Sequence, residues 1–232
     1  MKIALIGDLH GNYVATQALE AELRRHQVDD IYFLGDAVGK GPQNAETCDW
    51  VMKHCSLCVG GNWDYGIGGK EFPEDGYFWN QLGPERMEWL RTLPPERDVW
   101  ISGVHFRLFH GRPVTPLISA QTDKEVFAKA FRANGEVYTG IIFADSHRPF
   151  VRTLNDGYAL NTGSVGNSLG VPRAHALIID GELGCQTDAP LTMTILSVPY
   201  DNEAAAEAAR QDVNLPHRES FITEVLTGVY AR

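Results

Sequence analysis

Apolar runs and amphipathic segments alternate along the first sixty residues. Four of the five residues at 2–6 are apolar, and residues 31–34 form a second such run, so both are predicted to be buried strands. Residues 12–26 carry apolar side chains at helical spacing, and a second helix is expected at about 44–53, before a third strand at 57–59. This order predicts an α/β fold in which helices cover a sheet.

The pattern changes after residue 66, where glycine-rich and polar residues up to 76 predict a loop, followed by helical segments at 77–81 and 85–92. Further strands are expected at 99–101, 106–109, 137–143, 151–154, 158–161, 174–179 and 191–198. Asp123 is predicted to cap a helix that runs to about residue 132. With no linker or repeat in between, residues 1–232 are predicted to form a single domain with closing helices at about 203–228.

Composition narrows the classes of function. With 44% hydrophobic and 22% charged residues, the 232-residue chain is ordinary for a globular protein. Its formal charge of −10 argues against general nucleic-acid binding, which needs a basic surface. The sequence has neither a signal-peptide pattern nor an apolar run near eighteen residues, so we expect a cytoplasmic protein without a membrane partner.

Metal-type ligands follow the predicted strands. They are Asp8, His10, Asp36, Asn62, His110, Asp145 and His147. Because strand ends meet at one edge of an α/β sheet, these oxygen and nitrogen atoms are expected to converge on two divalent ions, with Asp36 as the bridge. Each residue taken alone has a structural explanation, such as a packed histidine at 110, a turn residue at 62 or a helix cap at 36. The joint pattern favours the metal site.

The motifs that contain these residues resemble, in order, those of the calcineurin-like metallophosphoesterase superfamily. They are Gly7-Asp8-Leu9-His10, Gly35-Asp36, Gly61-Asn62-Trp63-Asp64, His110-Gly111 and Asp145-Ser146-His147. Asn161-Thr162-Gly163-Ser164 is also similar to a segment of the small bacterial and archaeal phosphodiesterase branch. The resemblance implies a four-layer α/β/β/α metallophosphoesterase sandwich.

The resemblance also implies how a dinuclear centre is shared between ligands. Asp8, His10, Asp36 and His147 are expected to hold one metal, and Asp36, Asn62, His110 and Asp145 the other. Manganese is the expected metal, with iron, magnesium, nickel or zinc as alternatives. The implied activity is hydrolysis of phosphodiester or phosphomonoester bonds by a metal-bound hydroxide, with a small phosphoester or nucleotide as substrate.

Roles beyond metal binding are also expected. Catalysis is assigned to Asp36, Asn62 and Arg148, while Asn12, Arg112 and Arg148 are expected to bind the substrate phosphate. A protein phosphatase or a dinucleoside tetraphosphate hydrolase is the alternative within enzymes. A catalytically weak metal-binding scaffold is the alternative outside them, and a homo-oligomer is left open.

Two positions depart from the superfamily pattern. Trp63 stands where a histidine usually protonates the leaving oxygen, and an indole N–H can donate a hydrogen bond but cannot shuttle a proton. Asp145 stands where a histidine usually binds the second metal, and a carboxylate there favours manganese, magnesium or iron over zinc. Both departures are expected to affect the choice of metal and leaving group.

Overall fold

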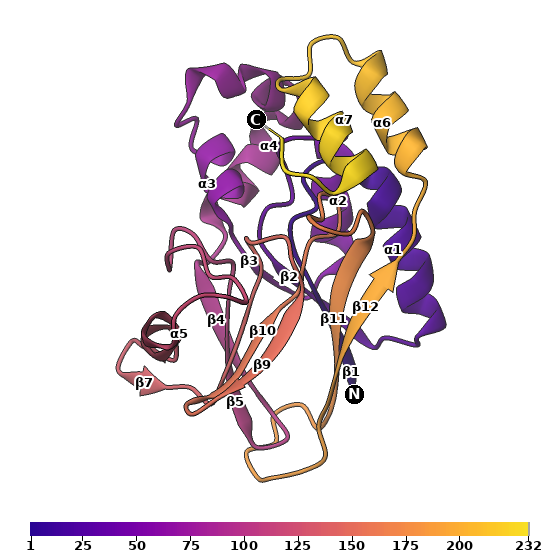
Figure 1. Ribbon diagram of the computed structural model, residues 1–232. Coiled ribbons are helices and arrows are strands. Elements are labelled where there is room, and N and C mark those ends of the chain that lie inside the picture. The colour runs from indigo at the N-terminus through magenta and orange to yellow at the C-terminus, as the bar shows by residue number, and fades with distance from the viewer. Residues whose placement is uncertain (232) are drawn as a thin grey trace.

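Two five-stranded sheets form the centre of the protein, which a computed structural model describes over residues 1–231 (Figure 1). The first sheet has the order β12-β11-β1-β2-β3, and the second β4-β5-β8-β10-β9. The first contains β1 (Lys2–Ile6), β2 (Asp30–Leu34), β3 (Leu57–Val59), β11 (Ala174–Asp180) and β12 (Thr192–Val198). The second contains β4 (Glu96–Ile101), β5 (Val104–Phe109), β8 (Gly140–Phe143), β9 (Phe150–Leu154) and β10 (Gly157–Asn161).

Helices cover the outer faces of both sheets. Against the first sheet and around its upper edge in Figure 1 lie α1 (Tyr13–Arg25), α2 (Asn44–His54), α3 (Asn62–Gly68), the short η1 (Pro73–Asp75), α4 (Gly76–Thr92), α6 (Asn202–Gln211) and α7 (Arg218–Thr227). On the second sheet lies α5 (Lys124–Ala130), next to a small hairpin of β6 (Arg132–Ala133) and β7 (Glu136–Val137). The predicted α/β/β/α order of layers is therefore confirmed. Within residues 1–231, none of the helices combines the length and apolar character needed to span a membrane.

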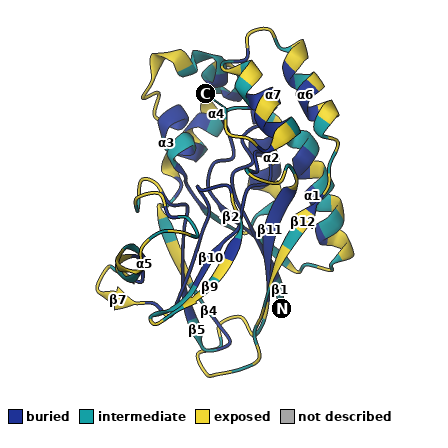
Figure 2. Ribbon diagram, in the orientation of Figure 1, coloured by how far each residue is buried: buried dark blue, intermediate teal, exposed yellow. Residues whose placement is uncertain are grey.

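The burial of β1 explains why residues 3–6 are all apolar. Ile3 and Leu5 pack in the core between the two sheets, whereas Ala4 and Ile6 point the other way, into the core beneath the helices. A strand covered on both faces cannot alternate polar and apolar residues. Figure 2 shows the same burial along the central strands, in contrast to the exposed outer helix faces.

The structure differs from the predicted elements in three places. Residues 66–68, expected in a loop, close α3, because Gly68 allows α3 to pack against the backbone of α4. The predicted strand 137–143 is wrong at its start: residues 136 and 137 pair with β6 across a turn at Asn134 and Gly135, which both have positive φ. The helix expected to reach residue 132 accordingly ends at 130. The helical segments predicted at 77–81 and 85–92 are both found within α4, on either side of a kink at Gly83, which has a φ of 71°.

Parallel pairing brings the relevant strand ends to one edge. The strands β1, β2 and β3 are parallel neighbours, and so are β5, β8 and β10. The segment after β10 then crosses to the first sheet, where the N–H groups of Val165 and Gly166 donate to the carbonyls of Gly7 and Asp8 at 3.0 Å each. The ends of both sheets are thus held together where the candidate ligands lie.

His175 supports this crossing segment from β11 below it. Its Nδ1 lies 2.9 Å from Ser168 Oγ and its Nε2 lies 3.2 Å from Ser197 Oγ. Burial, and next the Arg173 guanidinium, lower the pKa of His175 to about 4, compared with about 6.5 for an ordinary histidine. The folded protein therefore keeps this ring neutral at pH values where the unfolded chain binds a proton.

We expect stability to fall as the pH drops from about 6.5 towards 4, by up to about 1.4 kcal/mol per pH unit, because only the unfolded state gains the proton at position 175. His175→Gln should flatten this part of the profile. Urea unfolding between pH 4.5 and 7.5 measures the slope, and His26→Gln, at a side chain 41% exposed, is the control. Equal slopes for the wild type and His175→Gln would contradict the expectation.

Candidate metal centre

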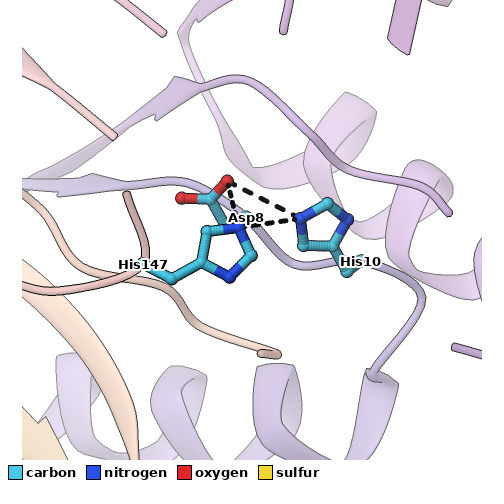
Figure 3. Close-up of side chains that lie close together, drawn as sticks. All are labelled: Asp8, His10 and His147. Carbon is cyan, nitrogen blue, oxygen red and sulfur yellow. Dashed lines mark hydrogen bonds and ion pairs between the residues drawn. The ribbon is translucent and has the colours of Figure 1, made fainter. Parts of the chain in front are cut away.

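Asp8, His10 and His147 form the first group of facing ligand atoms (Figure 3). Asp8 Oδ1 lies 3.3 Å from His147 Nε2 and 3.7 Å from His10 Nε2, and the two Nε2 atoms are 3.2 Å apart. Atoms bound to one ion at about 2.0–2.2 Å lie about 3 to 4 Å from each other. These three side chains can therefore hold a common divalent ion, although they come from the ends of strands in different sheets.

Asp8, Asp36 and His110 form a second group beside the first. His110 Nε2 lies 3.2 Å from Asp36 Oδ2 and 3.8 Å from Asp8 Oδ1. Asp36 Oδ2 is also 3.7 Å from His10 Nε2, so both carboxylates face both groups. Asp8 Oδ1 and His110 Nε2 are buried and have no hydrogen-bond partner among the described residues. Such unpaired polar atoms are costly in a protein interior and are what a cation would satisfy.

The three histidines are held in the orientation that a metal ligand needs. His10 Nδ1 lies 3.1 Å from the Val38 carbonyl, and His110 Nδ1 lies 2.7 Å from the Leu34 carbonyl. His147 Nδ1 lies 2.6 Å from the carbonyl of Asn167. In each case Nδ1 donates to the carbonyl, which leaves the Nε2 lone pair directed at the cluster.

Backbone strain accompanies five of the seven candidate ligands. Their φ angles are 55° at Asp8, 46° at His10, 60° at Asp36, 64° at Asp145 and 57° at His147. A left-handed conformation costs an L-residue roughly 1–2 kcal/mol, although Asp tolerates it better than most. The strain allows each strand end to turn sharply and to direct its side chain into the cluster, and it is concentrated at this one edge of the fold.

Asn62 and Asp64 begin α3 at the end of β3. Asn62 Oδ1 is buried without a hydrogen-bond partner among the described residues and borders the same cavity as Asp36. Asp64 accepts hydrogen bonds from the N–H groups of Asp36, Ala37 and Gly61 at 2.7, 2.9 and 3.0 Å. Burial, and then the nearby Asp36 carboxylate, raise the pKa of Asp64. Asp64 therefore fixes the loop that carries Asp36 and is not itself in either group of ligands.

Asp145 lies at the edge of the cluster, in contact with Arg112. Its Oδ1 is 3.9 Å from His110 Nε2, and both of its oxygens accept hydrogen bonds from the Arg112 side chain. Burial alone would raise the pKa of Asp145, but the bonds from Arg112 and the charge of His110 hold it below the ordinary value. Asp145 is thus an ionised carboxylate that lies between the Arg112 guanidinium and His110.

The histidines differ in proton affinity. Burial, followed by the charge of His147, lowers the pKa of His10 well below its ordinary value. Burial would also lower the pKa of His110, but Asp36 and Asp8 raise it well above the ordinary range. A divalent cation held by His110 would have to displace the proton on this ring, so binding there would release protons.

A cavity of about 1030 Å³ opens above the cluster. Asp36, Asn62, Asp145 and His147 border it on the ligand side. Its other lining side chains include the apolar residues Trp63, Phe72, Phe78, Leu117, Phe221 and Tyr230, and the cations Lys40, Arg112 and Arg148. Several of these come from α7 and the residues after it, whose docking over this edge is visible in Figure 1.

Residues 1–183 match the calcineurin-like phosphoesterase superfamily domain. The chain belongs to this superfamily. It is 27% identical to the uncharacterized protein MJ0912 of Methanocaldococcus jannaschii over 233 residues, which cover 88% of this chain and 90% of that protein. Its fold is similar to the crystal structure of a metallophosphoesterase from Sphaerobacter thermophilus, with 27% identity, a TM-score of 0.77 and 99% of both chains covered. It is also similar to the hypothetical protein PH1004 from Pyrococcus horikoshii OT3, with 23% identity, a TM-score of 0.79 and 99% coverage of both chains.

The three residues expected to bind substrate occupy different settings in this superfamily member. Arg148 is exposed and lines the cavity, as expected for a phosphate contact. Arg112 also lines it but is paired with Asp145. Asn12 instead caps α1, since its Oδ1 accepts from Ala15 N at 3.1 Å and its Nδ2 donates to the Gly166 carbonyl at 2.8 Å. The structure gives Asn12 a structural role away from the cavity.

Lys40 and Glu224 were not singled out by the sequence. Lys40 Nζ lies 2.9 Å from Glu224 Oε2 and 2.9 Å from Asn167 Oδ1, and Asn167 Nδ2 donates to the same Glu224 oxygen at 2.8 Å. Because the Asn167 carbonyl accepts from His147, this network connects α7 to a candidate ligand. The only available sequence signal was a lysine in the glycine-rich loop after Asp36.

Asp36→Asn is expected to weaken metal binding by more than the roughly 10–100-fold typical for loss of a supporting hydrogen bond, because the neutral amide removes the charge that faces both groups. Elemental analysis after manganese loading and desalting measures the bound metal. Asp49→Asn, at a surface carboxylate 55% exposed, is the matched control. Retention of wild-type metal content by Asp36→Asn would show that Asp36 is not a ligand.

Proposed function

We propose that this protein is a metal-dependent phosphoesterase that hydrolyses phosphodiester or phosphomonoester bonds at a dinuclear centre. Asp8, His10, Asp36 and His147 would hold one ion, and Asp36, Asn62, His110 and Asp145 the other. The observation that carries the proposal is the pair of adjacent ligand groups, both faced by the carboxylates of Asp8 and Asp36, below a cavity large enough for a small molecule. Manganese is the preferred ion because oxygen atoms form about half of this ligand set.

The ions, when bound, supply activation of water and neutralisation of phosphoryl charge. The chain itself supplies the positions of these ions and the binding of substrate. The exposed Arg148 side chain lines the cavity and makes no hydrogen bond to any of residues 1–231, so its guanidinium is free to donate to a phosphate oxygen. Asp36 and Asn62 would contribute as ligands, and the hydrogen bonds from the N–H groups of Asp36 and Ala37 to Asp64 fix the loop that carries Asp36.

The lining of the cavity favours a small substrate with an apolar or aromatic organic group. About 1030 Å³ is at the upper end of small-molecule sites, and aromatic side chains at 63, 72, 78, 221 and 230 offer stacking surfaces. A nucleoside or aryl phosphoester suits such walls. A protein phosphatase needs a groove for a polypeptide, whereas α7 contributes Ser220, Phe221 and Glu224 to the wall of this cavity, which favours the small-molecule alternative.

A metal-binding scaffold without turnover is the second candidate, and Trp63 is the feature that favours it. The indole ring lies edge-on to His10, with ring centroids 5.7 Å apart, where a proton donor is usual in this superfamily. The buried ligands Asp8, His10 and His110 would serve a metal-binding scaffold equally well, so we favour the enzyme on the cavity that gives a small molecule access to the ligand side.

A substrate screen tests the proposed activity. Metal-stripped protein reloaded with manganese is assayed on aryl phosphodiesters, phosphomonoesters, cyclic nucleotides and dinucleoside polyphosphates. We expect metal-dependent hydrolysis, strongest for substrates with good leaving groups. Absence of hydrolysis in every class, in protein shown to carry metal, would favour the scaffold.

Trp63→His is expected to raise kcat for alkyl phosphoesters about tenfold, and to change nitrophenyl esters little, because general-acid catalysis matters most for poor leaving groups. Steady-state rates across a leaving-group series measure the difference. Trp63→Phe, which removes the indole N–H but keeps an aromatic ring, is the control. A uniform change across the series would mean that proton transfer to the leaving group is not rate-limiting.

A further inference from the structure

Arg112 grips Asp145 with three hydrogen-bond donors. Its Nη2 lies 2.6 Å from Asp145 Oδ1, its Nε lies 3.1 and 3.0 Å from Oδ1 and Oδ2, and its backbone N–H donates to Oδ2 at 3.0 Å. Gly111 permits this approach, since a Cβ there would lie 2.6 Å from Asp145 Cβ. Neither oxygen of this carboxylate is left free of the guanidinium.

The same carboxylate also faces the second ligand group. Asp145 Oδ1 is 3.9 Å from His110 Nε2, which is the separation expected between two atoms bound to a common ion. Arg112 donates a hydrogen bond to this oxygen, and a divalent ion bound beside His110 would coordinate the same oxygen. The hydrogen bond from Arg112 Nη2 and a bond to the ion therefore compete for Asp145.

The Arg112 side chain also has room to occupy a second position. Its side chain is 51% exposed and lines the cavity in which the substrate phosphate is placed. A guanidinium that leaves Asp145 can turn into this cavity and bind phosphate oxygens through the same donors. Arg112 can therefore adopt two positions: the observed one, hydrogen-bonded to Asp145, and a second one directed at the substrate.

We propose that Arg112 is a built-in competitor for the second metal ion: it holds Asp145 when that ion is absent, and it is released to the substrate phosphate when the ion binds. The proposal rests on the dinuclear centre proposed above. The second ion therefore binds more weakly than the first, because it must displace a charge-assisted hydrogen bond. Phosphate in the cavity attracts the released guanidinium and so raises the affinity for the second ion. By linkage, the second ion raises the affinity for phosphate by the same factor.

The first ligand group lacks such a competitor. Asp8 Oδ1 has no hydrogen-bond partner among the described residues, and the Nε2 atoms of His10 and His147 lie within 3.7 Å of it. Lys40, another cation that lines the cavity, is instead paired with Glu224. The first ion is thus expected to bind without displacing an arginine, and the two sites fill in order.

Titration calorimetry of metal-stripped protein with manganese tests this competition through affinity alone. For the wild type we expect one tight and one weaker ion. Arg112→Gln should tighten the second ion by about tenfold or more, and leave the first within about twofold, because a neutral amide competes poorly for the carboxylate. Arg148→Gln is the matched control: it removes an arginine from the same cavity without touching Asp145, so the phosphate-free affinities should stay near those of the wild type.

Inorganic phosphate extends the test. Saturating phosphate should tighten the second ion in the wild type and have much less effect in Arg112→Gln. Arg112→Lys, with a single amine in place of the fork, should be intermediate, and it replaces Arg112→Gln if the latter fails to fold. Equal second-ion affinities in the wild type and these variants, or weaker binding in Arg112→Gln, would overturn the proposal. Binding of fewer than two ions by every variant, with and without phosphate, would overturn the dinuclear centre as well.

Discussion

Apolar side chains of β1 and β5 meet between the two sheets, where Ile3, Leu5 and Phe106 are buried. Asp8 follows the first of these strands and His110 the second, so the ligand atoms belong to different sheets. Their separation of 3.8 Å exists only while the sheets are packed. The loop after β10 adds backbone hydrogen bonds across the same edge. The geometry of the metal centre therefore depends on the stability of the core between the two sheets.

Burying this cluster requires compensation from the rest of the chain. The ligand atoms of each group lie within 4.8 Å of one another, where buried carboxylates need a cation or a protonated histidine beside them, and five ligand residues also carry backbone strain. Backbone carbonyls of Leu34, Val38 and Asn167 fix the rings, and Asp64 fixes the loop of Asp36. The fold therefore holds the ligands in position in the absence of an ion, which lowers the free-energy cost of reorganisation on metal binding.

The sequence predicted those parts of the site that depend on local order. Asp8 and Asp36 follow apolar strands, and parallel pairing then places them together. It did not predict the partners of Asp145 and Lys40, because Arg112 and Glu224 reach them by tertiary packing that leaves no periodic pattern. The same reason explains Asn12, whose position after the first motif suggested substrate contact, although its side chain completes a helix cap. Gly66 and Gly68 are typical of a loop by sequence, but both lie in α3, where Gly68 allows close packing against the backbone of α4.

Part of the cavity wall comes from the chain beyond the region that contains the ligands. All candidate ligands lie within residues 1–183, the range shared with the superfamily, whereas Phe221, Glu224 and Tyr230 lie beyond it. Lys40 and Asn167 attach this later segment to the ligand side through Glu224. Substitutions in the C-terminal segment can therefore change which organic group fits without altering any ligand. Under the proposed function, such substitutions would change substrate preference while leaving the metal centre intact.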